Sequence, residues 1–278
     1  MKKIEFVLTS KHNNKRFVAD ARWIANHTKK PTVILVHGFK GFKDWGAFNV
    51  IADQFANKGY CCVKLNFSSD GTTVDYPFEV TDHEAFGNNN FSKELDDLGV
   101  LIDWLHSDEC PIGTIDLSKL YLLGHSRGGG VVLLKTAEDE RIKKVATLAS
   151  IPQVNTFSEE TVEHWKKEGV IHVVNGRTNE ELPLYFQAVE DYYAHEDRLS
   201  MMKVLPTVTQ PILHIHGDAD ETVPIKAMDF LHQLNPASTC KTIEGASHTF
   251  NTKHPWTEET LSENMQTAID YVLDHFSE

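Results

Sequence analysis

The sequence predicts an α/β fold, in which a mostly parallel, twisted sheet carries helices on both of its faces. Short apolar runs of strand length alternate with stretches of helical periodicity along most of the 278 residues. Some of these runs, such as residues 32–37, are apolar at nearly every position, as in strands that are buried on both faces. Residues 152–206 interrupt the alternation, and we expect them to form an inserted, largely helical cap.

The first half of the chain is expected to supply four strands and two helices. The strands are predicted at residues 4–10, 16–25, 32–37 and 60–67, and the helices at residues 47–58 and 92–105. The polar sequence HNNK separates the first two runs and indicates an antiparallel hairpin. Gly59 is placed to end the first helix, and Ser92 is placed to cap the second.

The second half continues the alternation around the one interruption. Strands are predicted at residues 119–124, 143–149, 211–216 and 238–243, and helices at residues 131–139, 225–234 and 258–276. Residues 152–206 hold no clear buried strand, but they are rich in aromatic and charged side chains. We therefore expect a core formed by residues 1–151 and 207–278, with residues 152–206 inserted as the cap.

Charge and hydropathy exclude several classes of function. The formal net charge of −13 would repel the phosphates of nucleic acids, so we expect no nucleic-acid partner. No apolar stretch reaches the ~18 residues that a membrane-spanning helix needs. The apolar run at residues 4–8 is too short for the core of a secretory signal, so we expect a cytoplasmic protein. The oligomeric state is not indicated.

The sequence gives no sign of a metal or a cofactor. Its four cysteines lack the spacing of a zinc site, and we expect them to be free thiols. His214 and His216 alternate on one predicted strand and would share a face, but no third ligand with matching spacing is evident. The glycine run at residues 128–130 is not followed by the lysine of a phosphate-binding loop.

The sharpest chemical signal is the sequence GHSRG at residues 124–128, which joins a predicted strand to a predicted helix. Glycines on either side of Ser126 allow a turn too tight for larger side chains. A serine on such a turn projects its hydroxyl above the end of the sheet, and the next helix points its positive N-terminus at the same place. We therefore expect Ser126 to be a nucleophile.

Together with this turn, three further motifs resemble the α/β-hydrolase family over nearly the whole chain. They are HGF at residues 37–39, HGDADETVP at residues 216–224 and GASHTF at residues 245–250. The resemblance implies a nucleophile, an acid and a histidine in that order: Ser126, Asp220 and His248. It also implies that the backbone N–H groups of Phe39 and Arg127 stabilise the oxyanion of the reaction.

Two of these assignments have competitors nearby in the sequence. Asp218 could take the role of the acid, but the HGxxDxxVP pattern of the family favours Asp220, and a short polar side chain after the HG turn often caps the loop. His254 could take the role of the base, but only His248 directly follows the last predicted strand. The side chain of Arg127 is not needed for the chemistry and could lie in solvent.

Looser similarities point to a substrate class. The segments HGFKGFKDWGAF, ELDDLGVLIDWL and VVNGRT are similar to bacterial enzymes of the cinnamoyl-esterase, feruloyl-esterase and monoacylglycerol-lipase type. This implies a serine esterase that cleaves small carboxylic esters, such as hydroxycinnamoyl or short-acyl esters, through an acyl-enzyme. A thioesterase, a peptidase, an acyltransferase or a non-catalytic ligand-binding member of the fold remain alternatives. Trp165, Tyr185 and Tyr193 of the cap could line a substrate pocket or simply pack the cap onto the core.

Overall fold

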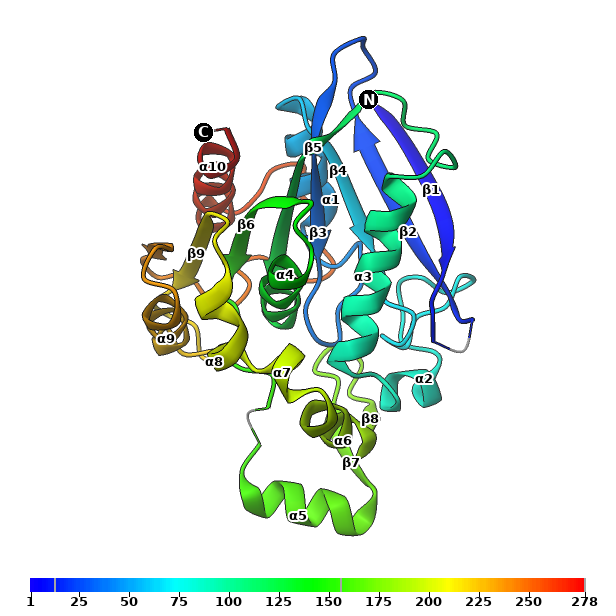
Figure 1. Ribbon diagram of the computed structural model, residues 1–278, viewed down its shortest axis with the longest axis vertical. Helices are drawn as coiled ribbons and strands as arrows, with labels where there is room; N and C mark the ends of the chain where they lie inside the picture. Colours follow the sequence, from blue (N-terminus) through cyan, green and yellow to red (C-terminus); the bar gives the residue numbers. More distant parts are fainter. Residues whose placement is uncertain (13, 156, 278) are drawn as a thin grey trace.

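The computed structural model describes residues 1–12, 14–155 and 157–277, and its centre is an eight-stranded sheet (Figure 1). The strand order is β1-β2-β4-β3-β5-β6-β9-β10. β2 pairs antiparallel with both β1 and β4, whereas the remaining neighbours are parallel. The strands are β1 (Lys2–Thr9), β2 (Arg16–Trp23), β3 (Lys30–Val36), β4 (Cys61–Leu65), β5 (Ile115–His125), β6 (Ile142–Leu148), β9 (Ile212–Gly217) and β10 (Thr239–Ile243). The predicted α/β class is confirmed.

Helices cover both faces of this sheet, as Figure 1 shows. On one face α1 (Phe48–Asn57) and α10 (Glu263–Ser277) enclose an apolar cluster. On the other face α3 (Phe91–Leu105), α4 (Arg127–Glu138) and α9 (Lys226–Leu234) enclose a second one. Since each central strand contributes side chains to both clusters, its apolar residues do not alternate with polar ones. Among the described residues, no helix combines the length and the apolar character needed to cross a membrane.

Residues 152–206, of which residue 156 lies outside the described part, lie beyond the carboxyl ends of the strands (Figure 1). Their elements are α5 (Glu159–Glu168), β7 (Val170–Val174), β8 (Glu181–Tyr185), α6 (Gln187–Ala194), α7 (Glu196–Leu199), α8 (Met201–Val204) and a short 3₁₀ helix (Leu205–Thr207). The antiparallel pair β7–β8 was not expected from the sequence. Both strands are only five residues long and partly exposed, and although β7 (VIHVV) is largely apolar, its partner β8 (ELPLY) is not.

Two further differences concern the ends of helices. Asn90, not Ser92, caps α3: its backbone is extended and its side chain accepts the N–H of Lys93 at 2.9 Å. Ser92 lies inside the first turn of the helix. A short helix, α2 (His83–Gly87), lies between β4 and α3, where the sequence predicted no helix, and Asp82 caps it. In the first hairpin, residue 13 of the expected HNNK turn lies outside the described residues.

Candidate active site

The turn that carries Ser126 has the tight geometry that its glycines predict. Ser126 has a φ of 54° and a ψ of −119° between β5 and α4, a strained backbone conformation for a residue with a side chain. A Cβ atom on Gly124 would lie 2.2 Å from the carbonyl oxygen of Gly128, and one on Gly128 would lie 2.4 Å from that of His37. The turn therefore requires glycine at both positions.

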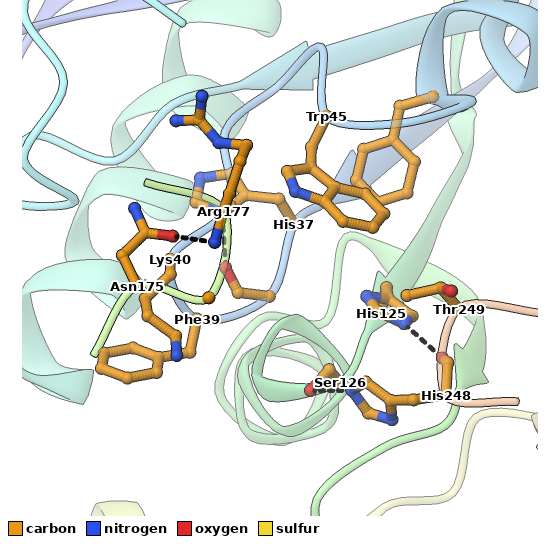
Figure 2. A pocket seen from close by; sticks show the side chains of 14 residues that line it. His37, Phe39, Lys40, Trp45, His125, Ser126, Asn175, Arg177, His248 and Thr249 are labelled. Atoms are coloured by element: carbon orange, nitrogen blue, oxygen red, sulfur yellow. Dashed lines mark hydrogen bonds between the residues drawn. The ribbon is translucent and has the colours of Figure 1, made fainter. Parts of the chain in front are cut away.

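Three predicted site residues from distant parts of the chain form one line of hydrogen bonds. Ser126 Oγ lies 2.9 Å from His248 Nε2, and His248 Nδ1 lies 2.8 Å from Asp220 Oδ2 (Figure 2 shows the first pair). Asp220 follows β9 and His248 follows β10, so adjacent parallel strands deliver both residues to the same edge of the sheet. This arrangement can move a proton from the serine to the histidine and stabilise the charge that results.

The surroundings of Asp220 keep its carboxylate ionised. Burial would raise the pKa of Asp220, but hydrogen bonds from His248 and from the backbone N–H groups of Val223 and Thr222 outweigh it, so the pKa lies below the ordinary value. His216 Nε2 also lies 3.2 Å from Asp220 Oδ2 while donating to the carbonyl oxygen of Val223. The competing acid, Asp218, instead accepts the backbone N–H of Gly245 at 2.7 Å.

The backbone N–H groups of Phe39 and Arg127 belong to the two segments that border the nucleophile. Arg127 is the first residue of α4, where helical N–H groups have no partner within the helix. The loop before Phe39 lies against the serine, because a Cβ atom on Gly38 would lie 3.0 Å from Ser126 Cβ. Within the described residues neither N–H has a backbone or side-chain acceptor in the protein, so both are free to bind an oxyanion.

The side chain of Arg127 does not lie free in solvent. Its Nε atom lies 2.9 and 3.0 Å from the two carboxylate oxygens of the buried Glu94, and its guanidinium lies 3.7 Å from the centre of the Phe91 ring. Arg127 therefore ties the start of α4 to the start of α3, which fixes the position of its own N–H.

Buried ion pairs hold the loop that carries Phe39. Lys43 Nζ lies 2.8 Å from Asp20 Oδ2 in β2 and 2.6 Å from Asp44 Oδ2. Burial would lower the pKa of Lys43, but the two carboxylates outweigh it and raise the pKa above its ordinary value. Lys43 is therefore charged, and its loop is attached to the sheet by electrostatic contacts rather than by apolar packing alone.

The remaining histidines singled out in the sequence have structural surroundings. His37 is buried, with Nε2 3.3 Å from Asp70 Oδ2, and His214 Nδ1 is hydrogen-bonded to Thr147 Oγ1. His254 packs against the rings of Phe42 and Trp45, and its Nδ1 accepts the backbone N–H of Gly46. In the part of the chain that the structure describes, no group of three or more metal-ligating side chains could hold an ion.

Two cavities have Ser126 and Phe39 in their walls. One, of about 220 Å³, lies on the side of His248 and is lined chiefly by Phe39, Lys40, Trp45, Phe48, Arg177 and Thr249 (Figure 2). The other, of about 320 Å³, lies beneath residues 152–206 and is mostly apolar, with Phe91, Ile151, Val154, Trp165, Val189 and Tyr192 in its walls. The site can therefore bind two chemically different halves of one molecule, with the reacting bond at Ser126.

The sequence predicted only some of the residues that line these cavities. Of the three cap aromatics, Trp165 lines the second cavity. Tyr185 instead donates to Glu84 Oε2, and Tyr193 is 60% exposed. Lys40 and Arg177 were missed because the first follows the HGF motif without belonging to it and the second lies on the unexpected β7–β8 turn. The positive charge of Lys40 and Arg177 was the only signal in the sequence, and nothing in the sequence indicates that the two residues line one cavity beside Ser126.

Comparison with known proteins gives both sequence and structural matches. A profile of the prolyl oligopeptidase family matches residues 47–276. The uncharacterized 31.7 kDa protein in the traX-finO intergenic region of Escherichia coli is 32% identical over 120 residues, which cover 43% of this chain. That match spans 37% of the length of the Escherichia coli protein.

Solved structures match over almost the whole length of both chains. Est1E from Butyrivibrio proteoclasticus has a TM-score of 0.69 and 17% identity, with 98% of this chain and 99% of Est1E covered. A structure of Est1E with ferulic acid bound matches with a TM-score of 0.67 and 19% identity, covering 100% and 96% of the two chains. A dienelactone hydrolase of Klebsiella pneumoniae has a TM-score of 0.62 and 15% identity, with both chains fully covered. These similarities show a shared α/β-hydrolase fold.

Proposed function

Because the chain belongs to the prolyl oligopeptidase family and is a serine hydrolase of the α/β-hydrolase fold, we propose that it cleaves small carboxylic esters through an acyl-enzyme. The observation that carries this proposal is the hydrogen-bonded line Ser126–His248–Asp220, which ends in a serine between two cavities. A hydroxyl in this setting becomes a nucleophile only when the histidine beside it takes its proton.

In the proposed reaction, His248 Nε2 removes the proton of Ser126 as Oγ attacks the ester carbon. The N–H groups of Phe39 and Arg127 stabilise the negative oxygen of the tetrahedral intermediate. Asp220 stabilises the protonated imidazole, which then gives its proton to the oxygen of the leaving alcohol. Water repeats the same steps on the acyl-enzyme, releasing the carboxylic acid and restoring the serine.

The size and lining of the cavities favour a small substrate. Volumes of about 220 and 320 Å³ suit groups of roughly ten to twenty heavy atoms in total, rather than a triglyceride. Apolar walls around Trp165 and Phe91 suit an aromatic or short aliphatic acyl group. Similarity to Est1E, one structure of which holds ferulic acid, supports including hydroxycinnamoyl esters in the first assays.

The family match itself favours a second candidate, the hydrolysis of a peptide bond. An ester and an anilide that share one acyl group distinguish the two reactions, because only the reacting bond differs. If kcat/KM for the 4-nitroanilide equals or exceeds that for the 4-nitrophenyl ester, the peptidase assignment replaces the esterase assignment.

Covalent labelling tests the mechanism directly. A fluorophosphonate probe should add to wild-type protein, and Ser126→Ala should lose both labelling and ester turnover. Ser118→Ala, which changes an exposed serine of β5, is the matched control and should retain both. Labelling that persists in Ser126→Ala, or ligand-induced stabilisation without turnover of any ester, would overturn the proposal in favour of a binding protein.

A further inference from the structure

The position of His248 distinguishes the roles of the two cavities. In the proposed reaction the protonated imidazole must reach the oxygen of the departing alcohol, so the leaving group lies on the histidine's side of Ser126. His248 and Thr249 line the 220 Å³ cavity, whereas neither residue lines the 320 Å³ cavity. The smaller cavity is therefore the leaving-group pocket, and the larger, apolar cavity holds the acyl group.

Two cationic residues line the leaving-group pocket, Lys40 from the loop after β3 and Arg177 from the β7–β8 turn (Figure 2). Lys40 Nζ donates to the carbonyl oxygen of Val174 at 2.9 Å, and half-burial lowers the pKa of this amine. Within the described residues neither cation forms a salt bridge, and no Asp or Glu lines the pocket. Because the chain has 40 acidic and only 27 basic residues, most cations are expected to have a carboxylate nearby, and these two differ in having none as a partner among the described residues.

Local contacts define the backbone of both residues. Lys40 has a φ of 60°, a conformation that favours glycine, and yet a lysine occupies it between Gly38 and Gly41. The Arg177 turn is built on the buried Asn175, whose side-chain oxygen accepts the N–H of Arg177 at 3.2 Å (Figure 2).

We propose that Lys40 and Arg177 bind a carboxylate carried by the leaving alcohol, so that the preferred substrates are esters of hydroxy acids. The inference rests on the proposed esterase function and adds the chemical class of the leaving group. Trp45 and Phe48 line the same pocket and suit an apolar or aromatic spacer between the hydroxyl and the carboxylate. The guanidinium fork of Arg177 matches the planar geometry of a carboxylate, and Lys40 adds a second positive charge.

The test compares two butyrate esters, one of 3-hydroxybenzoate and one of 3-hydroxybenzamide. The leaving groups are nearly equal in size and differ in charge. For wild-type protein we expect kcat/KM for the anionic ester to exceed that for the neutral ester by on the order of tenfold. This ratio should fall as salt is added, because screening weakens the attraction.

Charge-removing variants assign the effect to the two residues. Lys40→Gln and Arg177→Gln should each lower the ratio several-fold, and the double variant should bring it near one, while Arg177→Lys should keep part of it. Lys166→Gln removes an exposed lysine from α5 and should leave the ratio as in the wild type. If Lys40→Gln does not fold, Arg177→Gln on its exposed turn still decides the question.

The outcomes separate this inference from the function on which it rests. Hydrolysis of the neutral ester with a wild-type ratio near one, or a ratio unchanged in the folded Arg177→Gln variant, overturns the carboxylate pocket and leaves the esterase intact. Failure of the wild type to hydrolyse either ester overturns both proposals. A ratio that falls only with Arg177→Gln assigns the site to Arg177 and overturns the role of Lys40.

Discussion

His125 Nε2 donates a hydrogen bond to the backbone carbonyl oxygen of His248 across 2.9 Å, so the residue before the nucleophile holds the loop that carries the proposed base. Burial, together with the nearby His248, lowers the pKa of His125 to about 3, and its ring therefore stays neutral. A carbonyl oxygen can only accept, so the single ring proton of His125 must reside on Nε2.

His125→Phe keeps a ring in this place but removes the donor. The loop of His248 then loses a hydrogen bond and the carbonyl oxygen of His248 loses its partner, a change worth about 1–2 kcal/mol. We expect kcat to fall on the order of tenfold, with little change in KM, since the loss concerns the alignment of the base. Steady-state kinetics alongside His106→Ala, at the exposed end of α3, would check this, and equal kcat values in both variants would refute it.

Asp220→Asn should lower kcat roughly a thousandfold to ten-thousandfold, because an amide cannot stabilise the protonated imidazole and can favour the wrong tautomer. Asp218→Asn is the matched control, since asparagine can still accept the backbone N–H of Gly245 through its side-chain oxygen. Steady-state kinetics on one aryl ester measures kcat for both variants. Should Asp218→Asn prove the more damaging, the assignment of the acid would have to be reversed.

Gly128→Ala should damage both folding and activity. The new methyl group would lie 2.4 Å from the carbonyl oxygens of Val36 and His37, so the end of β3 or the start of α4 must move. We expect a loss of about 1–3 kcal/mol in the free energy of unfolding and slower labelling of Ser126. Gly113→Ala, where a Cβ atom would meet nothing within 4 Å, should change neither quantity in denaturation and labelling experiments. Equal behaviour of the two variants would contradict the close approach.

Asp97 should make stability depend on pH in an unusual direction. Burial, only partly offset by hydrogen bonds from Ser10 and Ser68, raises the pKa of this carboxyl to about 6. A raised pKa in the folded state gives stability at low pH that is lost as the pH rises through about 6. Asp97→Asn does not titrate, and its amide can still bond to both partners.

The stability of Asp97→Asn relative to wild type should therefore increase by about 1.4 kcal/mol between about pH 5 and about pH 8. Urea denaturation of both proteins at the two pH values measures this difference, in which all other titrating groups cancel. A difference that stays constant or shrinks with pH would show that the folded carboxyl titrates near its ordinary pKa.

Much of the fold could be predicted because its signals are local. The apolar run at residues 32–37 predicts a buried strand, and the GHSRG sequence predicts a tight turn, each from only a few residues. The order of the motifs along the chain then predicts which residues are the partners of Ser126. That Asn90 rather than Ser92 caps α3 could not be predicted, because both residue types cap helices well and only the backbone angles decide between them.

The walls of the pockets lie beyond such local reasoning. Lys40 and Arg177 lie 137 residues apart in the sequence, and the backbone conformation of Lys40 depends on a φ angle that its sequence does not reveal. Likewise, the sequence identifies Glu94 only as one acidic residue of an amphipathic helix, and its ion pair with Arg127 is formed by the tertiary fold. Contacts that depend on tertiary approach rather than on periodicity were the ones missed.

The turn that carries Arg177 joins two strands that pair only with each other, outside the eight-stranded sheet. Insertions or deletions in that turn would leave the register of the large sheet and the elbow of Ser126 untouched. Relatives that differ there could consequently diverge in the compounds they accept while inheriting the same reaction chemistry, which makes this short hairpin the place to begin when redesigning selectivity.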